Sequence, residues 1–140
     1  VKVIAGVLTL GETTAHGPVN GRGVRLSTDP LYLDVHLPGG SAFTAPISSG
    51  HSAFLYMYEG NGAIGAQGSV KPLPHRAAGV LSDGDNVRIE AGAEGVQFLL
   101  LAARPIAEPV VQYGPFVMNT REEIEQALAD YRDGRLAVTA

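Results

Sequence analysis

The sequence predicts an all-β sandwich or barrel followed by one helix. Three observations predict it. The 18 glycines and 9 prolines separate short apolar runs at close spacing, some of these runs alternate apolar with polar residues, and a helical period appears only near the end. Such punctuation is typical of many short strands joined by turns. With 140 residues, of which 45% are hydrophobic and 17% charged, we expect one globular domain over residues 1–140.

The first strands are expected in the middle of the chain. The segment LYLDVHL alternates cleanly, as a half-buried strand requires. It places Leu31, Leu33, Val35 and Leu37 on one face and Tyr32, Asp34 and His36 on the other. SAFLYMY is expected to form a second strand, and EGNGAIG, residues 59–65, a glycine-rich hairpin turn.

Further strands follow in the second half of the chain. We expect two short strands in VKPL and AAGVL, and a turn in SDGD that leads into the strand NVRIE. The run VQFLLLAA, residues 96–103, is almost continuously apolar and is expected to be buried on both faces.

The last segment predicts a helix. Thr120 followed by Glu123 is the pattern of a capping box, and Gly134 suits the C-terminal cap. An apolar stripe is expected from the i, i+4, i+7 spacing of Ile124, Leu128 and Tyr131.

Composition and charge exclude several classes of function. The chain has no cysteine, which excludes disulfides, thiolate metal sites and cysteine nucleophiles, and its net charge of -4 argues against direct nucleic-acid binding. The start, VKVIAGVLTLGE, is too short for a membrane span and lacks the features of a signal peptide, so we expect no targeting or transmembrane segment and no membrane partner, with a cytoplasmic location as the default. Since the chain begins with valine, we expect residues upstream of it.

Two glycine-framed segments have the spacing of the cupin superfamily. From Gly84, the intervals to Glu90, Gly92, Gly95 and Leu99 resemble the second cupin motif, which is glycine, five residues, proline, one residue, glycine, two residues, histidine, three residues and asparagine. The first motif, with two histidines and a glutamate as ligands, is framed by Gly40 and Gly60. The resemblance places the four ligand positions at Pro46, Ser48, Ala53 and Gly95, or at Ile47, Ser49, Ala53 and Gly95 if the loop is one residue shorter.

Neither register keeps a metal ligand. A transition-metal site needs several imidazole, carboxylate or thiolate donors, and Ala53 and Gly95 have no donor side chain. The two-residue period of a strand instead predicts an apolar interior with one polar group, Gln97. We expect Ala53, Leu55 and Met57 to face inward on one side and Gly95, Gln97 and Leu99 on the other, so that Leu55, Met57, Gln97 and Leu99 line a candidate interior pocket.

Three longer segments resemble the C-terminal half of pirins and pirin-related proteins over residues 1–136. They are GHSAFLYMYEGNGAIG, VLSDGDNVRIEA and EPVVQYGPFVMNTREEIEQALADYRDG. The resemblance implies a cupin-type jelly-roll β-barrel over residues 1–115, closed by a signature segment and helix over residues 116–136. It also implies a bicupin protein, whose N-terminal barrel holds an iron-type metal on three histidines and a glutamate. This chain does not contain that barrel, so we expect no metal or other cofactor in this domain.

Isolated histidines and serines offer little for catalysis. His16, His36, His51 and His75 lie in different segments, without metal-ligand spacing, so we expect turn or solvated histidines. His51 is the acid–base candidate to watch. Ser48, Ser49 and Ser52 crowd around it, but a serine-rich loop without an oriented base and an oxyanion hole favours an ordinary turn.

The sequence therefore favours a supporting function. We expect a metal-free cupin module that assists a partner barrel in quercetin 2,3-dioxygenase-type chemistry or transcriptional co-regulation, the two functions that the resemblance implies. The alternatives are an autonomous small-molecule-binding cupin and a quercetinase-like enzyme with a non-standard site. The aromatic side chains of Phe43, Phe54, Tyr56 and Tyr58 are a candidate recognition surface. Expected partners are an N-terminal pirin-type barrel, a second copy of the chain or a transcription-related protein.

Overall fold

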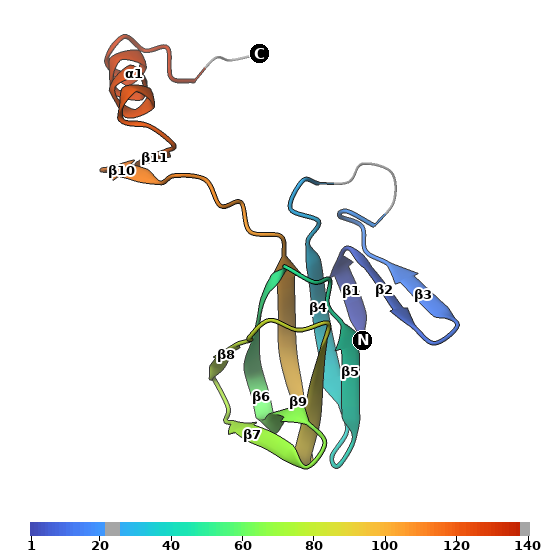
Figure 1. The fold of residues 1–140 in the computed structure, drawn as a ribbon. Helices are drawn as coiled ribbons and strands as arrows, with labels where there is room; N and C mark the ends of the chain where they lie inside the picture. Colours follow the sequence, from blue (N-terminus) through green and yellow to red (C-terminus); the bar gives the residue numbers. More distant parts are fainter. Residues whose placement is uncertain (22–25, 138–140) are drawn as a thin grey trace. The chain divides into compact units, whose positions relative to one another are not determined.

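The computed structural model describes residues 1–21 and 26–137 and divides the chain into two compact units, residues 1–105 and 106–140 (Figure 1). The prediction that residues 1–140 form a single domain stays a prediction. The first unit contains β1 (Lys2–Ala5), β2 (Val7–Leu10), β3 (Thr13–His16), β4 (Leu31–Leu37), β5 (Ala42–Pro46), β6 (Ser52–Ala66), β7 (Ser69–Leu73), β8 (Ala78–Val80) and β9 (Asn86–Ala103). The second unit contains β10 (Val111–Tyr113), β11 (Phe116–Met118) and α1 (Arg121–Arg132).

A seven-stranded antiparallel sheet forms the first unit. Its strand order is β1-β4-β9-β6-β7, with β5 also paired to β9 and β8 to β6, while β2 and β3 form a separate hairpin. The first part of β9 pairs with β5 and the last part with β4, and β6 runs beside both parts. The sheet therefore bends back on itself into two layers, one with β4 and the last part of β9 and the other with β5 and the first part of β9. The core fills the space between these layers.

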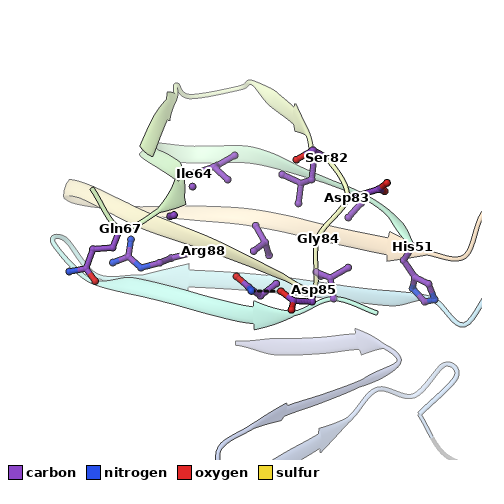
Figure 2. Close-up of a pocket in the computed structure, with 15 residues that line it drawn as sticks. His51, Ile64, Gln67, Ser82, Asp83, Gly84, Asp85 and Arg88 are labelled. Carbon is purple, nitrogen blue, oxygen red and sulfur yellow. Dashed lines mark hydrogen bonds between the residues drawn. The ribbon is translucent and has the colours of Figure 1, made fainter. Parts of the chain in front are cut away.

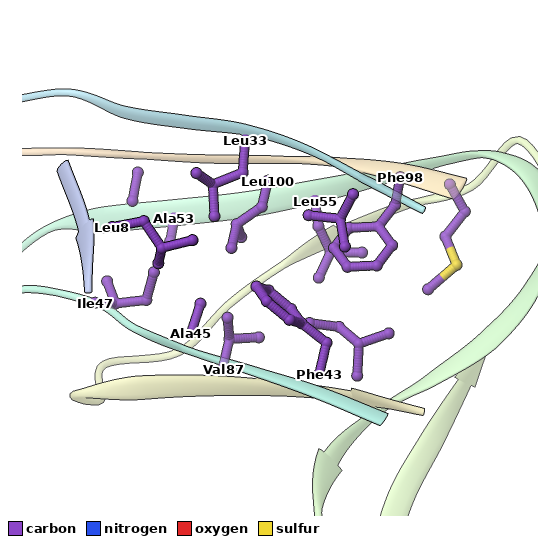
Figure 3. Packing of buried hydrophobic residues seen from close by; sticks show 14 of the residues in the cluster. Leu8, Leu33, Phe43, Ala45, Ile47, Ala53, Leu55, Val87, Phe98 and Leu100 are labelled. Atoms are coloured by element: carbon purple, nitrogen blue, oxygen red, sulfur yellow. The ribbon is translucent and has the colours of Figure 1, made fainter. Parts of the chain in front are cut away.

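The core is apolar throughout. Figure 3 shows Leu33, Leu55 and Leu100 reaching into it from one layer and Phe43 and Val87 from the other. The predicted alternation of β4 is confirmed, because Leu33 and Val35 are fully buried whereas the alternate residues are not. The predicted all-β fold with one C-terminal helix is thus present.

The segment EGNGAIG does not form the predicted hairpin turn. Strand β6 continues through it to Ala66, with register shifts against β9 between Met57 and Glu59 and between Gly60 and Gly62. Gly60 has a φ of 70°, and a Cβ placed on it would lie 2.2 Å from the carbonyl oxygen of Gly95. These glycines therefore permit a bulge where two strands approach closely, instead of a reversal of the chain.

A second bulge reverses the inward face of β9. Val87 and Ile89 face inward in its first part, whereas Val96, Phe98 and Leu100 face inward in its last part. In β9, side chains of odd-numbered residues point inward before the bulge, and side chains of even-numbered residues point inward after it. Gly95, with a φ of 86°, lies at this change. Because one extra residue in a strand turns every following side chain to the other face, the bulge decides which leucines fill the core.

The second unit is a two-stranded ribbon with one helix. Thr120 caps α1, and the predicted capping box is formed, with the Thr120 hydroxyl accepting from the Glu123 amide and the Glu123 carboxylate accepting from the Thr120 amide. Ile124 and Ala127 are buried, but Tyr131 is exposed, so the predicted stripe is wrong at its last position. In the part of the chain that the structure describes, no helix has the length and apolar character needed to cross a membrane.

Candidate functional site

Aliphatic side chains from three strands meet at one end of the core. They are Ala45, Ile47, Ala53 and Val87, with exposed fractions of 0%, 7%, 8% and 4%. Ala45 lies opposite Val87 in the β5–β9 pairing, and the amide of Ile47 donates to the carbonyl oxygen of Asp85 at 2.9 Å. We call these four residues the aliphatic end.

The ligand positions predicted from the cupin spacing do not converge. Ala53 faces inward, as does Ile47 of the alternative register, but Pro46, Ser48 and Ser49 are exposed. Ala53 pairs with Ala102 near the start of β6, whereas Gly95 lies next to Val96, which pairs with Gly60 farther along the same strand. Gly95 therefore lies several residues along the strand from the place where a fourth ligand would have to be.

A count from a different glycine brings the second cupin motif to the aliphatic end. Suppose that Gly84 is the second glycine of the cupin pattern and not the first. The histidine position, two intervening residues later, is then Val87, and the asparagine position, three further intervening residues later, is Ala91. Val87 then takes the histidine position, and it lies in the aliphatic end. The turn SDGD before β9 could have pointed to this frame, since it immediately precedes a strand with inward-facing residues.

A metal ion does not fit the aliphatic end. Alanine, isoleucine and valine side chains carry no lone pair, and a divalent transition metal needs several nitrogen, oxygen or sulfur donors. Among residues 1–21 and 26–137, no group of three or more histidine, aspartate or glutamate side chains is placed to hold a metal ion.

An open cavity of about 530 Å³ begins at the aliphatic end (Figure 2). Its apolar lining comes from Ile47, Ala53, Ile64, Leu81 and Val87. Its polar lining comes from His51, Gln67, Ser82, Asp83, Asp85, Asn86 and Arg88. We call it the mouth cavity. Its volume lies within the range of small-molecule sites, which combine apolar walls with a few polar groups.

The predicted interior pocket is wrong in half of its residues. Leu55 and Met57 are fully buried, as predicted, but they pack in the filled core. Gln97 and Leu99 lie on the opposite, outer face of the sheet, because the bulge at Gly95 reverses the inward parity. The open space therefore lies at the aliphatic end and not around Gln97.

His51 lines the mouth cavity and also a neighbouring cavity of about 360 Å³ that contains Ser48. The amide of His51 donates to the carbonyl oxygen of Ser48 at 3.1 Å, as expected for a turn. In the described part of the chain, no hydrogen bond joins its imidazole to Ser48, Ser49 or Ser52, so the arrangement of a nucleophile and its base is not formed there.

Two of the other histidines have defined side-chain partners. His16 Nδ1 lies 2.7 Å from the carbonyl oxygen of Gly21, and His36 Nε2 lies 2.8 Å from the hydroxyl of Tyr58. At His75 it is the backbone amide that donates, to the Asn61 side chain. These histidines serve local structure in separate parts of the first unit.

The outer face of β4, β9 and β6 carries a row of large apolar side chains. Tyr32 pairs with Leu101, Leu101 with Phe54, and Phe54 with Val80 of β8. Phe54 and Val80 are 42% and 88% exposed. The next row contains Leu99 and Tyr56. We call Tyr32, Phe54, Tyr56, Leu99 and Leu101 the outer apolar face.

Two predictions about this region need correction. Leu99 and Leu101 stay partly exposed, so VQFLLLAA is fully buried on one face only within this chain. Phe43 is not part of an exposed aromatic surface, because it is buried in the core 6.4 Å from Phe98, measured between ring centroids. Phe54 and Tyr56 are exposed as expected.

A polar cluster borders the outer apolar face. The hydroxyl of Tyr58 donates to Asp34 Oδ1 at 2.7 Å, and His36 Nε2 lies 3.2 Å from the same oxygen. Desolvation, the hydrogen bond to Asp34 and the negative charge of that carboxylate raise the pKa of Tyr58 to about 12. Tyr58 therefore keeps its proton, and acts as a donor, over the whole physiological range.

Comparison with known proteins gives one family. Residues 32–137 match the model of the Pirin C-terminal cupin domain. A Pseudomonas aeruginosa protein with a provisional quercetin 2,3-dioxygenase assignment is 45% identical over 139 residues, which are 99% of this chain and 46% of that protein. Human pirin is 42% identical over 110 residues, which are 77% of this chain and 38% of pirin.

A solved structure agrees with this assignment. The crystal structure of quercetin 2,3-dioxygenase from Acinetobacter baumannii has a TM-score of 0.75 and 29% identity, over 96% of this chain and 43% of that one. The chain thus spans less than half the length of the relatives that it matches.

Proposed function

Because the chain belongs to the pirin family, whose C-terminal cupin domain it matches, we propose that it is a supporting cupin module without a metal ion of its own. The module packs through its outer apolar face against a second cupin barrel. The oxygen chemistry or co-regulator function of a whole pirin-like protein then depends on that second barrel, and this module holds or covers it.

The observation that carries the proposal is the chemistry of the aliphatic end. Three strands of a cupin fold bring Ala45, Ile47, Ala53 and Val87 together, and none of these side chains can bind a metal or transfer a proton. Since a fold hosts many functions, the function must be argued from the site, and this site supports packing instead of metal chemistry.

The outer apolar face supports the docking part of the proposal. Antiparallel sheets that face water on one side usually carry polar side chains there, whereas this face carries Tyr32, Phe54, Tyr56, Leu99 and Leu101. Contiguous exposed apolar surface marks interaction sites. The relatives are also more than twice as long as the matched segment, which leaves room for a second domain of similar size.

Sedimentation velocity of the purified chain tests this proposal. Without another barrel, a second copy of the module is the available cupin partner, so we expect a concentration-dependent dimer. Phe54→Asp should shift the chain to monomer, because it places a charge in the apolar row. Leu10→Asp is the matched control, since Leu10 is similarly exposed but lies in the β2–β3 hairpin.

Two results would contradict the proposal. One is a wild-type chain that stays monomeric at every concentration reached. The other is a dimer that Phe54→Asp and Leu10→Asp weaken equally, because the contact would then lie outside the outer apolar face.

A further inference from the structure

We propose that the mouth cavity binds a small amphipathic cation, an amine carried on a compact apolar body. This inference goes beyond the supporting function and does not depend on docking to a partner barrel. The apolar body would lie against the aliphatic end, and the amine would lie beside the carboxylates of Asp83 and Asp85.

The floor of the cavity fits an apolar group. Ile47, Ala53 and Val87 of the aliphatic end form part of it, with Ile64 and Leu81 beside them. The small side chain of Ala53 forms part of this floor. A bound apolar group would remove from water the parts of this surface that are still exposed, mainly those of Ile64 and Leu81, and such burial favours binding.

The rim of the cavity is negatively charged. Asp83 and Asp85 are exposed and make no ion pair within the described residues. Among the described residues that line the cavity, Arg88 is the one lysine or arginine, and its guanidinium already pairs with the carboxylate of Glu90, which lies outside the lining. The rim therefore favours a cation over a carboxylate of the same shape.

The acidic loop is held in place before any ligand arrives. The amide of Leu81 donates to the carbonyl oxygen of Ala53 at 3.0 Å. The amide of Ile47 donates to the carbonyl oxygen of Asp85 at 2.9 Å. These bonds tie both ends of the loop to the strands of the floor. The Asn86 side chain also donates to Asp85 Oδ1 and so orients that carboxylate, which can still accept from an amine at its other oxygen. A preformed site loses less free energy on ordering when it binds.

Amide proton–nitrogen NMR spectra of the full chain, titrated with three probes that share one apolar body, test the inference. The probes are phenethylamine, phenethyl alcohol and hydrocinnamate, which are cationic, neutral and anionic. We expect saturable shifts at residues around Ala53, Ile64 and Asp83 to Arg88 with phenethylamine. The neutral probe should bind about tenfold more weakly and the anionic probe more weakly still.

Variants test the location and the charge separately. The double variant Asp83→Asn and Asp85→Asn should weaken phenethylamine binding about tenfold and abolish the preference for the amine over the alcohol. Glu94→Gln is the matched control, because Glu94 is an exposed carboxylate outside the mouth cavity. Ala53→Val should weaken all three probes by filling the floor, and the double variant of the loop keeps the inference testable if Ala53→Val disturbs folding.

Three results would overturn the inference. The first is the absence of saturable shifts around the mouth cavity with phenethylamine at millimolar concentration. The second is equal binding of phenethylamine and hydrocinnamate. The third is an equal loss of affinity in Glu94→Gln and in the double variant. None of these results would bear on dimer formation, so the inference and the proposed function can fail separately.

Discussion

The two faces of the β6–β9 strand pair differ sharply, although alternate residues of the same two strands build both. On the inner face, Leu55 lies opposite Leu100 and Met57 opposite Phe98, and all four side chains are fully buried. On the outer face, Phe54 lies opposite Leu101 and Tyr56 opposite Leu99, and these side chains remain partly exposed.

The difference shows what each face requires. The inner face is completed within the chain, since β5 and the first part of β9 cover it. The outer face has the composition of a buried surface, yet Phe54 and Val80 on it stay exposed among the residues that the structure describes. Exposed apolar surface of this kind is typical of interaction sites, and it is the surface through which we propose that the module docks.

The largest expected effect is a difference in stability between two neighbouring leucines. Leu100→Ala should lower the free energy of unfolding by about 2–5 kcal/mol, because it leaves a cavity in the core. Leu101→Ala should lower it by less than about 1 kcal/mol, since its outward side chain loses little contact. Urea unfolding of both variants measures the two losses in the free energy of unfolding. Equal losses would mean that the inner and outer faces do not differ in packing.

The next effect concerns the bulge that assigns the leucines to their faces. Gly95→Ala should cost about 1–3 kcal/mol, because its φ is positive and the new Cβ would lie 2.7 Å from the carbonyl oxygen of Leu37. Gly68→Ala is the control, with a φ of 82° but nothing within 4 Å. Thermal unfolding should rank Gly95→Ala as the more damaging, and the reverse order would argue against a tightly packed bulge.

A smaller effect separates the rows of the outer face. Leu101→Ser should weaken self-association about tenfold, or about 1.4 kcal/mol, because Leu101 lies in the apolar row. Gln97→Ala should change it by no more than about threefold, since Gln97 pairs with His36 and Glu59 in a polar row. Sedimentation equilibrium gives both dissociation constants. A stronger effect of Gln97→Ala would move the contact to the polar row.

The smallest effect is confined to alkaline pH. Because the pKa of Tyr58 is raised from 10.0 to about 12, the folded state holds this proton more tightly than the unfolded state. Its contribution to stability is complete below pH 10 and is lost as the pH rises toward 12. The difference in unfolding free energy between the wild-type chain and Tyr58→Phe should therefore shrink over that interval. A constant difference from neutral to alkaline pH would contradict this assignment.

The fold could be predicted from the sequence wherever a regular period or a local signal governs it. The alternation of residues 31–37 gave the inner face of β4, and Thr120 with Glu123 gave the start of α1. Both depend on residues close in sequence. The likeness of three segments to pirins gave the family, which the match over residues 32–137 shows.

The site could not be predicted in the same way, because bulges break the two-residue period. A count that continues through Gly95 places Gln97 and Leu99 inside, whereas the structure places Phe98 and Leu100 there. Glycine permits the positive φ of a bulge, but it equally permits the positive φ of a turn. The glycines of residues 59–65 are therefore compatible with a bulge and with a hairpin turn, and the sequence alone does not distinguish them. Tyr131 is exposed because the buried face of α1 runs through Ile124 and Ala127.

Metal content tests the central claim most directly. The purified chain would be exposed to iron, copper, nickel and zinc, with and without oxygen, then freed of unbound metal and analysed for metal bound per chain. Because the aliphatic end offers no donor, we predict that no metal is retained. One tightly held ion per chain would contradict the account, and its ligands would have to come from His16, His36, His51, His75 and the carboxylates.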